Sequence, residues 1–245
     1  MKKCKFSVIS VTYGDLPGIE RTLASVFSQS YSCFEIIVID GHKDDSTKRF
    51  LESISDDRLF WVSEADSGLY DAMNKGLRFA TGDYVIFLNG GDTFFDRKVL
   101  FDISSLVDDR VLFGRVLVDS KKYIPPLSVT KDNFRDWLCS SEPNHQSMFV
   151  PSDLAKAVGF DLRYKICADL NFKLKLMLIC DFSFTEREIS VFDGDGVSSR
   201  PNMKNYARQY FERKKIVDGL GFPSHYRSSF RFFIKYLFMK LNLLG

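Results

Sequence analysis

The sequence is poor in the features that mark several large classes of protein. Its 245 residues include five cysteines, seven prolines and three histidines. An odd number of cysteines without metal-type spacing argues against a disulfide scaffold or a zinc site, and favours reduced thiols in a cytosolic protein. The amino terminus lacks the longer apolar run and the cleavage site of a secretory signal, so we do not expect export. The sequence shows no internal repeat and no low-complexity tract.

The chain does contain one recurring pattern, in which a short apolar run is followed by an amphipathic stretch. Hydrophobic residues make up 45% of the sequence, enough for one sizeable core. Asp15 is placed to cap the first helix, and Gly82 to end the third. The pattern predicts an α/β fold with a parallel sheet and right-handed crossovers. The expected strands are residues 5–12, 34–39, 58–62 and 84–88, and the expected helices begin at residues 16, 47 and 69.

Polar residues follow the ends of these strands. Thr12 and Tyr13 follow the first strand, Asp40 follows the second, and the turn Asn89–Asp92 follows the fourth. Open α/β sheets bind ligands beyond the carboxyl ends of such strands. We expect Asn89–Asp92 to form an exposed acidic turn at the rim of the sheet.

Several motifs occur in the order found in one enzyme family. They are VISVTYG, IDG at 39–41, DSGLYDAMNKG at 66–76, the acidic turn, HQ at 145–146 and GFDLRYKICADL at 159–170. With these motifs the chain resembles family 2 glycosyltransferases of the GT-A fold, and is most similar to the bacterial colanic acid, O-antigen and capsule branch. The resemblance implies a Rossmann-like, mostly parallel central sheet flanked by helices over residues 1–199. A basic C-terminal helical extension then occupies residues 200–245.

The resemblance also implies a donor site for a UDP-sugar. In such enzymes the loop after the first strand packs the base and ribose, and the aspartate after the second strand binds uracil. Thr12, Tyr13 and Asp40 occupy these positions. From the residues alone, Asp40 is a turn former, Asp66 a helix cap and Lys75 a solvated cation. The other residues assigned to the donor are Asp66, Gly68, Asp71, Asn74, Lys75, Asn89, Gly90 and Gly91.

The acidic turn departs from the family pattern, in which two or three acids are common. Only Asp92 remains, and we assign it to Mg²⁺ or Mn²⁺ bound together with the donor diphosphate. Such cations take one or two protein carboxylates and fill the other positions with phosphate oxygens and water, so one acid can suffice. Asn89 can add a neutral oxygen. The alternatives are a glycine turn with a capping Asp, and an enzyme that is metal-independent or only weakly metal-dependent.

The resemblance places the catalytic base at Asp169, near a helix N-terminus that favours its ionised form. Asp161 is a weaker alternative, because Arg163 can pair with it. His145 and Gln146 are assigned to the acceptor side, although a lone histidine is more often structural. The loop at 194–199, GDGVSS, resembles the segment that covers the donor in relatives, and could equally be a turn.

Charge is distributed unevenly along the chain. From residue 200 onward ten Lys and Arg stand against two acids, which gives +8 in a chain whose total is +2. Residues 230–244 are apolar around most of a helix, but too short and too charged for a span of about 20 apolar residues. We expect this segment to lie on an anionic membrane surface. The alternatives are packing on the domain and a homodimer contact. Nucleic acid is disfavoured, because the aromatics are embedded among aliphatics.

The resemblance, together with these residues, implies an inverting glycosyltransferase that moves a hexose or N-acetylhexosamine from a UDP-sugar to a surface glycan. The expected acceptor is linked to a polyprenyl diphosphate at the inner face of the bacterial cytoplasmic membrane. Direct displacement needs one base and no covalent nucleophile. A sugar nucleotidyltransferase is the alternative enzyme, but no glycine-rich triphosphate loop follows the first strand. A degenerate, non-enzymatic scaffold is the third interpretation, and the missing acids in the turn support it.

Overall fold

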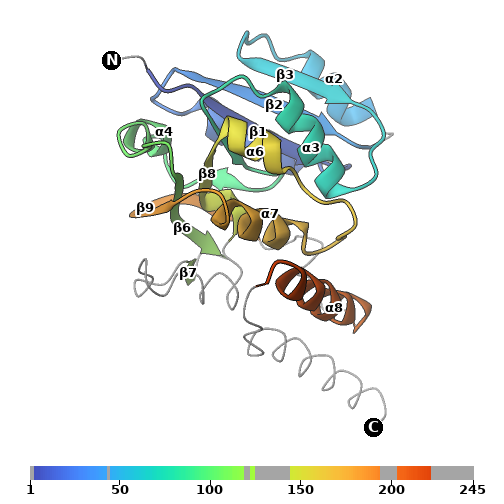
Figure 1. Ribbon diagram of the computed structural model, residues 1–245. Helices are drawn as coiled ribbons and strands as arrows, with labels where there is room; N and C mark the ends of the chain where they lie inside the picture. The colour runs from blue at the N-terminus through green and yellow to red at the C-terminus, as the bar shows by residue number, and fades with distance from the viewer. Residues whose placement is uncertain (1–2, 43–44, 119–121, 125–143, 194–202, 222–245) are drawn as a thin grey trace.

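A computed structural model of the chain describes residues 3–42, 45–118, 122–124, 144–193 and 203–221 (Figure 1). Strands and helices alternate along the first ninety residues, as predicted. The strands are β1 (Phe6–Thr12), β2 (Phe34–Asp40), β3 (Leu59–Ser63), β4 (Tyr84–Phe87), β5 (Thr93–Phe94), β6 (Val111–Val118), β7 (Lys122–Ile124), β8 (Met148–Pro151) and β9 (Phe182–Phe192). The helices are α1 (Leu16–Phe27), α2 (Asp45–Glu52), α3 (Leu69–Phe79), α4 (Val99–Ile103), α6 (Ser152–Val158), α7 (Ala168–Met177) and α8 (Met203–Gly219), with a 3₁₀ turn, η1, at His145–Ser147.

The first four strands form the parallel half of the sheet, in the order β3-β2-β1-β4. The pairing of β1 with β2 runs from Phe6 opposite Phe34 to Thr12 opposite Asp40, so the two strands end level with each other. This confirms the predicted α/β architecture. It also brings the polar residues after these strands to one edge.

The second half of the sheet has mixed directions, which the sequence patterns did not resolve. β8 lies antiparallel to both β4 and β6, and β6 pairs with β9 in parallel. The short strand β5 pairs with β9, with Thr93 opposite Val191. Since Thr93 directly follows Asp92, this pairing holds the Asn89–Asp92 turn against the end of β9.

Two hydrophobic clusters cover the two faces of the sheet. One contains Ile9 and Val11 of β1 together with residues of α3, α6, α7 and α8, and α3 and α6 lie in front of the sheet in Figure 1. The other contains Phe6 and Val8 together with residues of α1, α2 and α4. Alternate residues of β1 therefore face opposite layers of helices, as extended geometry requires.

The third helix ends earlier than predicted. α3 stops at Phe79 with Ala80 as its C-cap, so Gly82 lies beyond the helix and does not end it. A Cβ at Gly82 would lie 2.7 Å from the carbonyl oxygen of Lys5, which shows that a glycine is needed where the chain passes β1. The predicted cap of α1 is confirmed, since Gly18 N donates to Asp15 Oδ1 at 2.9 Å.

Part of the predicted C-terminal extension packs on the domain. α8 contacts α7, and its residues Ile216 and Val217 are buried in the same cluster as Ile9. In the part of the chain that the structure describes, no helix combines the length and hydropathy that crossing a membrane requires. The predicted donor-covering loop at 194–199 and the apolar segment at 230–244 lie outside the described residues.

Candidate active site

The ends of β1, β2 and β4 form the floor of the candidate site. Gly41 N donates to Thr12 O (3.0 Å), and Gly90 N donates to Val11 O (2.9 Å), so the residues after β2 and β4 are both held against β1. A Cβ at Gly90 would lie 3.3 Å from Thr12 Oγ1. Thr12, Gly90 and the loop after Asp40 therefore lie together, as the positions of the motifs predicted.

Asp40 and Tyr13 have contrasting environments at this edge. Asp40 is fully buried, and its carboxylate accepts hydrogen bonds from Ser63 Oγ (2.9 Å) and His42 N (3.2 Å). Both carboxylate oxygens of Asp40 thus already accept hydrogen bonds from the protein. Binding of a nucleobase by Asp40 would require this loop to shift. The Tyr13 ring is 70% exposed and meets the His42 ring edge-on, with centroids 4.8 Å apart. Tyr13 thus offers an accessible aromatic face for stacking.

Asp66, Gly68 and Asp71 build the turn before α3. Asp66 Oδ1 accepts from Gly68 N (2.8 Å), and Asp71 Oδ2 accepts from Ser67 N (2.9 Å). Gly68 has a φ of 118°, which favours glycine. A Cβ at Gly41 would lie 1.9 Å from Asp66 Oδ2, so the Asp66 carboxylate lies against the loop after β2. Asp66 therefore borders the floor of the site, whereas Asp71 makes a helix-capping contact.

Asn74 and Lys75 make structural contacts. The Asn74 amide donates to Phe160 O and accepts from Phe160 N, both at 2.8 Å, so it clamps α3 to the segment before α7. The Lys75 ammonium donates to Ala65 O and pairs with Glu64, both at 2.8 Å. Lys75 is 8% exposed, so the alternative of a solvated cation is wrong. Because both polar ends of the Asn74 amide are engaged, we leave it out of the donor set proposed below.

The prediction that Asn89–Asp92 is an exposed turn is wrong. Asp92 is only 3% exposed. Its Oδ2 accepts from Gln146 Nε2 (2.9 Å), and its Oδ1 accepts from the backbone N–H of Asp193 (3.3 Å). The residues that cover Asp92 come from η1 and the end of β9, far along the chain, and no local pattern around Asp92 indicates them.

Thr22 of α1 fixes the same turn from the other side. Its hydroxyl accepts from Gly91 N (3.0 Å) and lies 2.7 Å from Asp92 O. Gly91 has a φ of 99°, a conformation that side chains rarely tolerate. Thr22 therefore holds the backbone of this turn, while Gln146 and Asp193 hold the carboxylate of Asp92 turned inward.

The surroundings of Asp92 fit a divalent cation that arrives with a nucleotide. Burial raises the pKa of Asp92 to about 6, although hydrogen bonds from Gln146 and Asp193 act in the opposite direction. Asn89 Oδ1, in the same turn, is buried and lacks a hydrogen-bond partner within the described ranges. No group of three His, Cys, Asp or Glu side chains in those ranges could hold a metal alone. One carboxylate and one amide oxygen are sufficient when a diphosphate supplies further ligands.

Asp169 lies in the first turn of α7 and is ionised. Its Oδ2 is 2.9 Å from the ammonium of Lys173, a side chain with no exposed surface. Its Oδ1 accepts from Leu170 N (2.8 Å) and lies 3.4 Å from the Tyr70 hydroxyl. Burial alone would raise the pKa of Asp169, but Lys173 and His145 outweigh it and hold this pKa well below its usual range. Asp169 is therefore a carboxylate throughout the physiological range.

His145 and Gln146 connect the two acids. His145 Nδ1 is 3.9 Å from Asp169 Oδ2, and its Nε2 is 3.1 Å from the Asn89 amide nitrogen. The adjacent residue Gln146 binds Asp92. The HQ motif therefore joins the turn after β4 to the start of α7 within one short segment.

Asp161, the alternative base, is paired as anticipated. Its carboxylate lies 2.6 Å from Arg163 Nη2 and 4.0 Å from the ammonium of Lys175. Hydrogen bonding to Arg163 lowers the pKa of Asp161 to about 2. The partner Arg163 lies two residues after Asp161, so the sequence already indicated this ion pair.

Sequence reasoning missed four residues of the site. Lys173 could have been found, because it follows Asp169 by four residues on a helix, a spacing that pairs opposite charges. The others reach the site only through the tertiary fold and carry no local signal. They are Thr22, Ser63 and Asp193.

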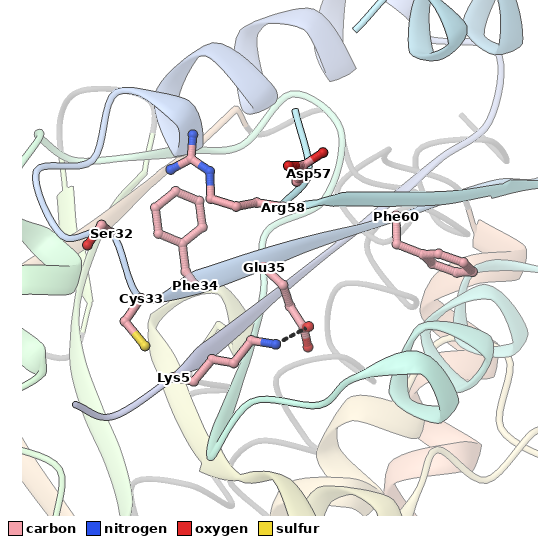
Figure 2. Close-up of a pocket in the computed structure, with 8 residues that line it drawn as sticks. All are labelled: Lys5, Ser32, Cys33, Phe34, Glu35, Asp57, Arg58 and Phe60. Carbon is pink, nitrogen blue, oxygen red and sulfur yellow. Dashed lines mark hydrogen bonds and ion pairs between the residues drawn. The ribbon is translucent and has the colours of Figure 1, made fainter. Parts of the chain in front are cut away.

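A separate hollow of about 360 Å³ lies at the opposite, amino-terminal edge of the sheet (Figure 2). Its lining includes Lys5, Glu35 and Arg58, which precede or begin β1, β2 and β3. The Lys5 ammonium is 2.6 Å from Glu35, and Arg58 is 2.7 Å from Asp56. Because these charges neutralise each other locally, we assign the hollow no part in the chemistry.

Comparisons with known proteins agree with this arrangement. Residues 7–121 match the family model described as Glycosyl transferase family 2. The chain is 32% identical over 203 residues to the uncharacterized glycosyltransferase Rv1514c of Mycobacterium tuberculosis, covering 79% of this chain and 76% of that relative. This chain belongs to glycosyl transferase family 2. It is therefore a glycosyltransferase, and we set aside the nucleotidyltransferase and the non-enzymatic scaffold.

Solved structures show the fold of this glycosyltransferase. S. aureus TarS 1-349 in complex with UDP-GlcNAc matches with a TM-score of 0.69 at 20% identity, over 88% of this chain and 71% of the TarS 1-349 chain. The mannosyltransferase PcManGT from Pyrobaculum calidifontis, in complex with GDP-Man and Mn²⁺, matches with a TM-score of 0.65 at 18% identity, over 94% of this chain and 69% of that chain. Both likenesses confirm the predicted GT-A fold.

The buried carboxyl of Asp92 gives a pH-dependent stability that can be measured. Between its ordinary value of 3.8 and a folded pKa of about 6, the unfolded chain loses this proton while the folded chain keeps it. Folding stability therefore falls as the pH rises through this window, by about 3 kcal/mol from this group. We expect wild type to lose this stability between pH 4 and pH 7, whereas Asp92→Asn has no proton to lose at this position. The free energy of unfolding of Asp92→Asn minus that of wild type should therefore rise by a similar amount over this range, measured by urea denaturation in EDTA.

Asp161→Asn is the matched control. Since the pKa of Asp161 is lowered to about 2, its ionised form stabilises the fold above pH 4, and this stability is lost as the pH falls toward 2. Its stability difference from wild type should change with pH in the opposite direction. Parallel curves for Asp92→Asn and wild type would show that folding leaves the pKa of Asp92 at its ordinary value.

Proposed function

We propose that this enzyme is an inverting glycosyltransferase that takes a hexose or N-acetylhexosamine from a UDP-sugar. One observation carries the proposal: the HQ motif holds Asp92, at the end of β4, and an ionised Asp169 on the two sides of one site. A single displacement needs a site for the leaving diphosphate and one base. Asp92 and Asp169 fit these two roles.

The donor side uses the edge formed by β1 and β2. The exposed Tyr13 ring stacks on the base, with Thr12, Asp40, Asp66 and the loop after β2 bordering the nucleoside. Gly90 and Gly91 let the backbone approach the diphosphate. The UDP-GlcNAc bound by TarS favours uridine, and the GDP-Man bound by PcManGT makes guanosine the alternative to test.

Asp92, with the oxygen of Asn89, would hold Mg²⁺ or Mn²⁺. Bound there, the cation would neutralise the developing charge of the diphosphate leaving group. Gln146 keeps the Asp92 carboxylate oriented, and Thr22 keeps the turn closed. The Mn²⁺ in the PcManGT complex supports this assignment.

Asp169 takes the proton from the acceptor hydroxyl as the new glycosidic bond forms. Its negative charge, maintained by Lys173 and His145, means that it is in the required state before the acceptor binds. The low pKa also makes Asp169 a weak base. Proton transfer therefore occurs late, because the hydroxyl proton becomes acidic only as its oxygen bonds to the anomeric carbon of the sugar. We place His145 beside Asp169 on the acceptor side, whereas Gln146 contacts Asp92.

A panel of nucleotide sugars tests the donor assignment. Release of UDP or GDP should be measured with each sugar, with and without a short lipid diphosphate acceptor, in Mn²⁺ and in EDTA. We expect acceptor-dependent UDP release that EDTA suppresses, and an inverted anomeric configuration in the product by NMR. Turnover with GDP-sugars alone, or a retained configuration, would contradict the proposal.

The base assignment predicts a selective loss of transfer. Asp169→Asn leaves the buried Lys173 ammonium without its carboxylate partner, which would cost about 3–5 kcal/mol of stability. We therefore combine it with Lys173→Gln. The double variant should bind the UDP-sugar with wild-type affinity by calorimetry, while transfer falls by about 10²-fold or more. Asp161→Asn should retain transfer. If Asp161→Asn alone shows the selective loss, the base is Asp161.

The proposed acceptor is a glycan on a polyprenyl diphosphate. The enzyme would reach it through the apolar run at 230–244 of the basic extension at 200–245, a proposal that the sequence supports. Removing residues after Ser228 should release the protein from anionic vesicles, since both apolar burial and about 1 kcal/mol per basic residue are lost. Transfer to a water-soluble acceptor should persist. Wild-type binding should weaken with salt without vanishing. Unfolding or loss of a dimer in the truncated protein would instead place the segment in the core or at a subunit interface.

A further inference from the structure

The carboxylate of Glu212, on α8, caps the start of α7. Its Oε1 accepts from Lys165 N, and its Oε2 accepts from Ile166 N and Cys167 N, all at 3.0 Å. These are three successive backbone N–H groups in the turn that leads into α7. Such groups have no partner within the helix, so a carboxylate at this point satisfies them and complements the helix dipole.

The same turn is held from the opposite side by α3. The Tyr70 hydroxyl donates to Ile166 O (2.7 Å) and lies 3.4 Å from Asp169 Oδ1. Asp169 follows Cys167 by only two residues. The position of its carboxylate therefore depends on a turn fixed between Tyr70 and Glu212.

α8 is itself anchored, so Glu212 cannot follow a movement of the turn. Gln209, Arg213 and Ile216 on this helix are each at most 4% exposed, and Gln209 O lies 3.8 Å from the Cys167 thiol. The helix is thus packed as part of the domain on both sides of Glu212. Its hydrogen bonds therefore tie the start of α7 to a helix that is packed on the domain.

We propose that Glu212 is a positioning residue for Asp169, so that the C-terminal helix is part of the catalytic apparatus. This rests on the proposed role of Asp169 as the base. Glu212 makes its contacts with backbone N–H groups, not with the donor floor at β1, β2 and β4. Its loss should therefore affect the transfer step and leave nucleotide binding unchanged.

The test compares Glu212→Ala and Glu212→Gln with Asp218→Asn, a control on the same helix whose exposed carboxylate pairs with Lys214 at 2.9 Å. A shift of about 1 Å in a reacting group can lower a rate by 10²-fold. We expect kcat of Glu212→Ala to fall by about 10- to 100-fold, with UDP-sugar affinity unchanged by calorimetry. Glu212→Gln, which keeps one acceptor oxygen, should lose less. Asp218→Asn should match wild type.

A double-mutant cycle separates positioning from a general structural effect. If Glu212 acts through Asp169, adding Glu212→Ala to the Asp169→Asn, Lys173→Gln double variant should lower transfer no further. Additive losses, or an equal loss of UDP-sugar affinity, would overturn the inference while the base assignment stands. If the Asp169→Asn, Lys173→Gln double variant retains full transfer, the base assignment fails and this inference fails with it. Should Glu212→Ala not fold, Glu212→Gln carries the same cycle.

Discussion

The ion pair between Asp169 and Lys173 is the interaction on which the acceptor side of the site depends. Lys173 has no exposed surface, and a buried ammonium is tolerated only beside an opposite charge. The buried positive charge of Lys173 therefore stabilises the ionised form of Asp169. Stability and chemistry are coupled here, because the group that would accept a proton is also the group that makes a buried cation tolerable.

Asp92 shows the opposite electrostatic design within the same network. Asp169 is stabilised by a full positive charge, whereas Asp92 is buried among hydrogen-bond donors and has its pKa raised to about 6. Burial without a charged partner disfavours the ionised form, so Asp92 would gain from a nearby cation. The two acids, linked by His145 and Gln146, therefore differ in how readily they ionise.

The sequence predicted the parts of the structure that depend on local pattern. The strands and helices of the parallel half follow from periodicity and caps, and the motif order predicted the family and the fold. Burial of Asp92 could not be predicted, because Gln146 and Asp193 lie 54 and 101 residues away from it. The contacts of Asn74 could not be predicted either, because its partner Phe160 lies 86 residues away in the sequence. Lys173 was within reach, since the i,i+4 spacing was visible.

The pairing of β5 with β9 has a consequence for how the enzyme matures during synthesis. Residues 6–94 supply the parallel half of the sheet and α1, and they are synthesised before Gln146 and Asp193. The turn that carries Asp92 can be held by Thr22 at that stage, but its cover from Gln146 and Asp193 does not yet exist. Asp92 therefore gains its full cover only once β9 has been made. The Asn89–Asp92 turn is thus among the last parts of this sheet edge to be completed.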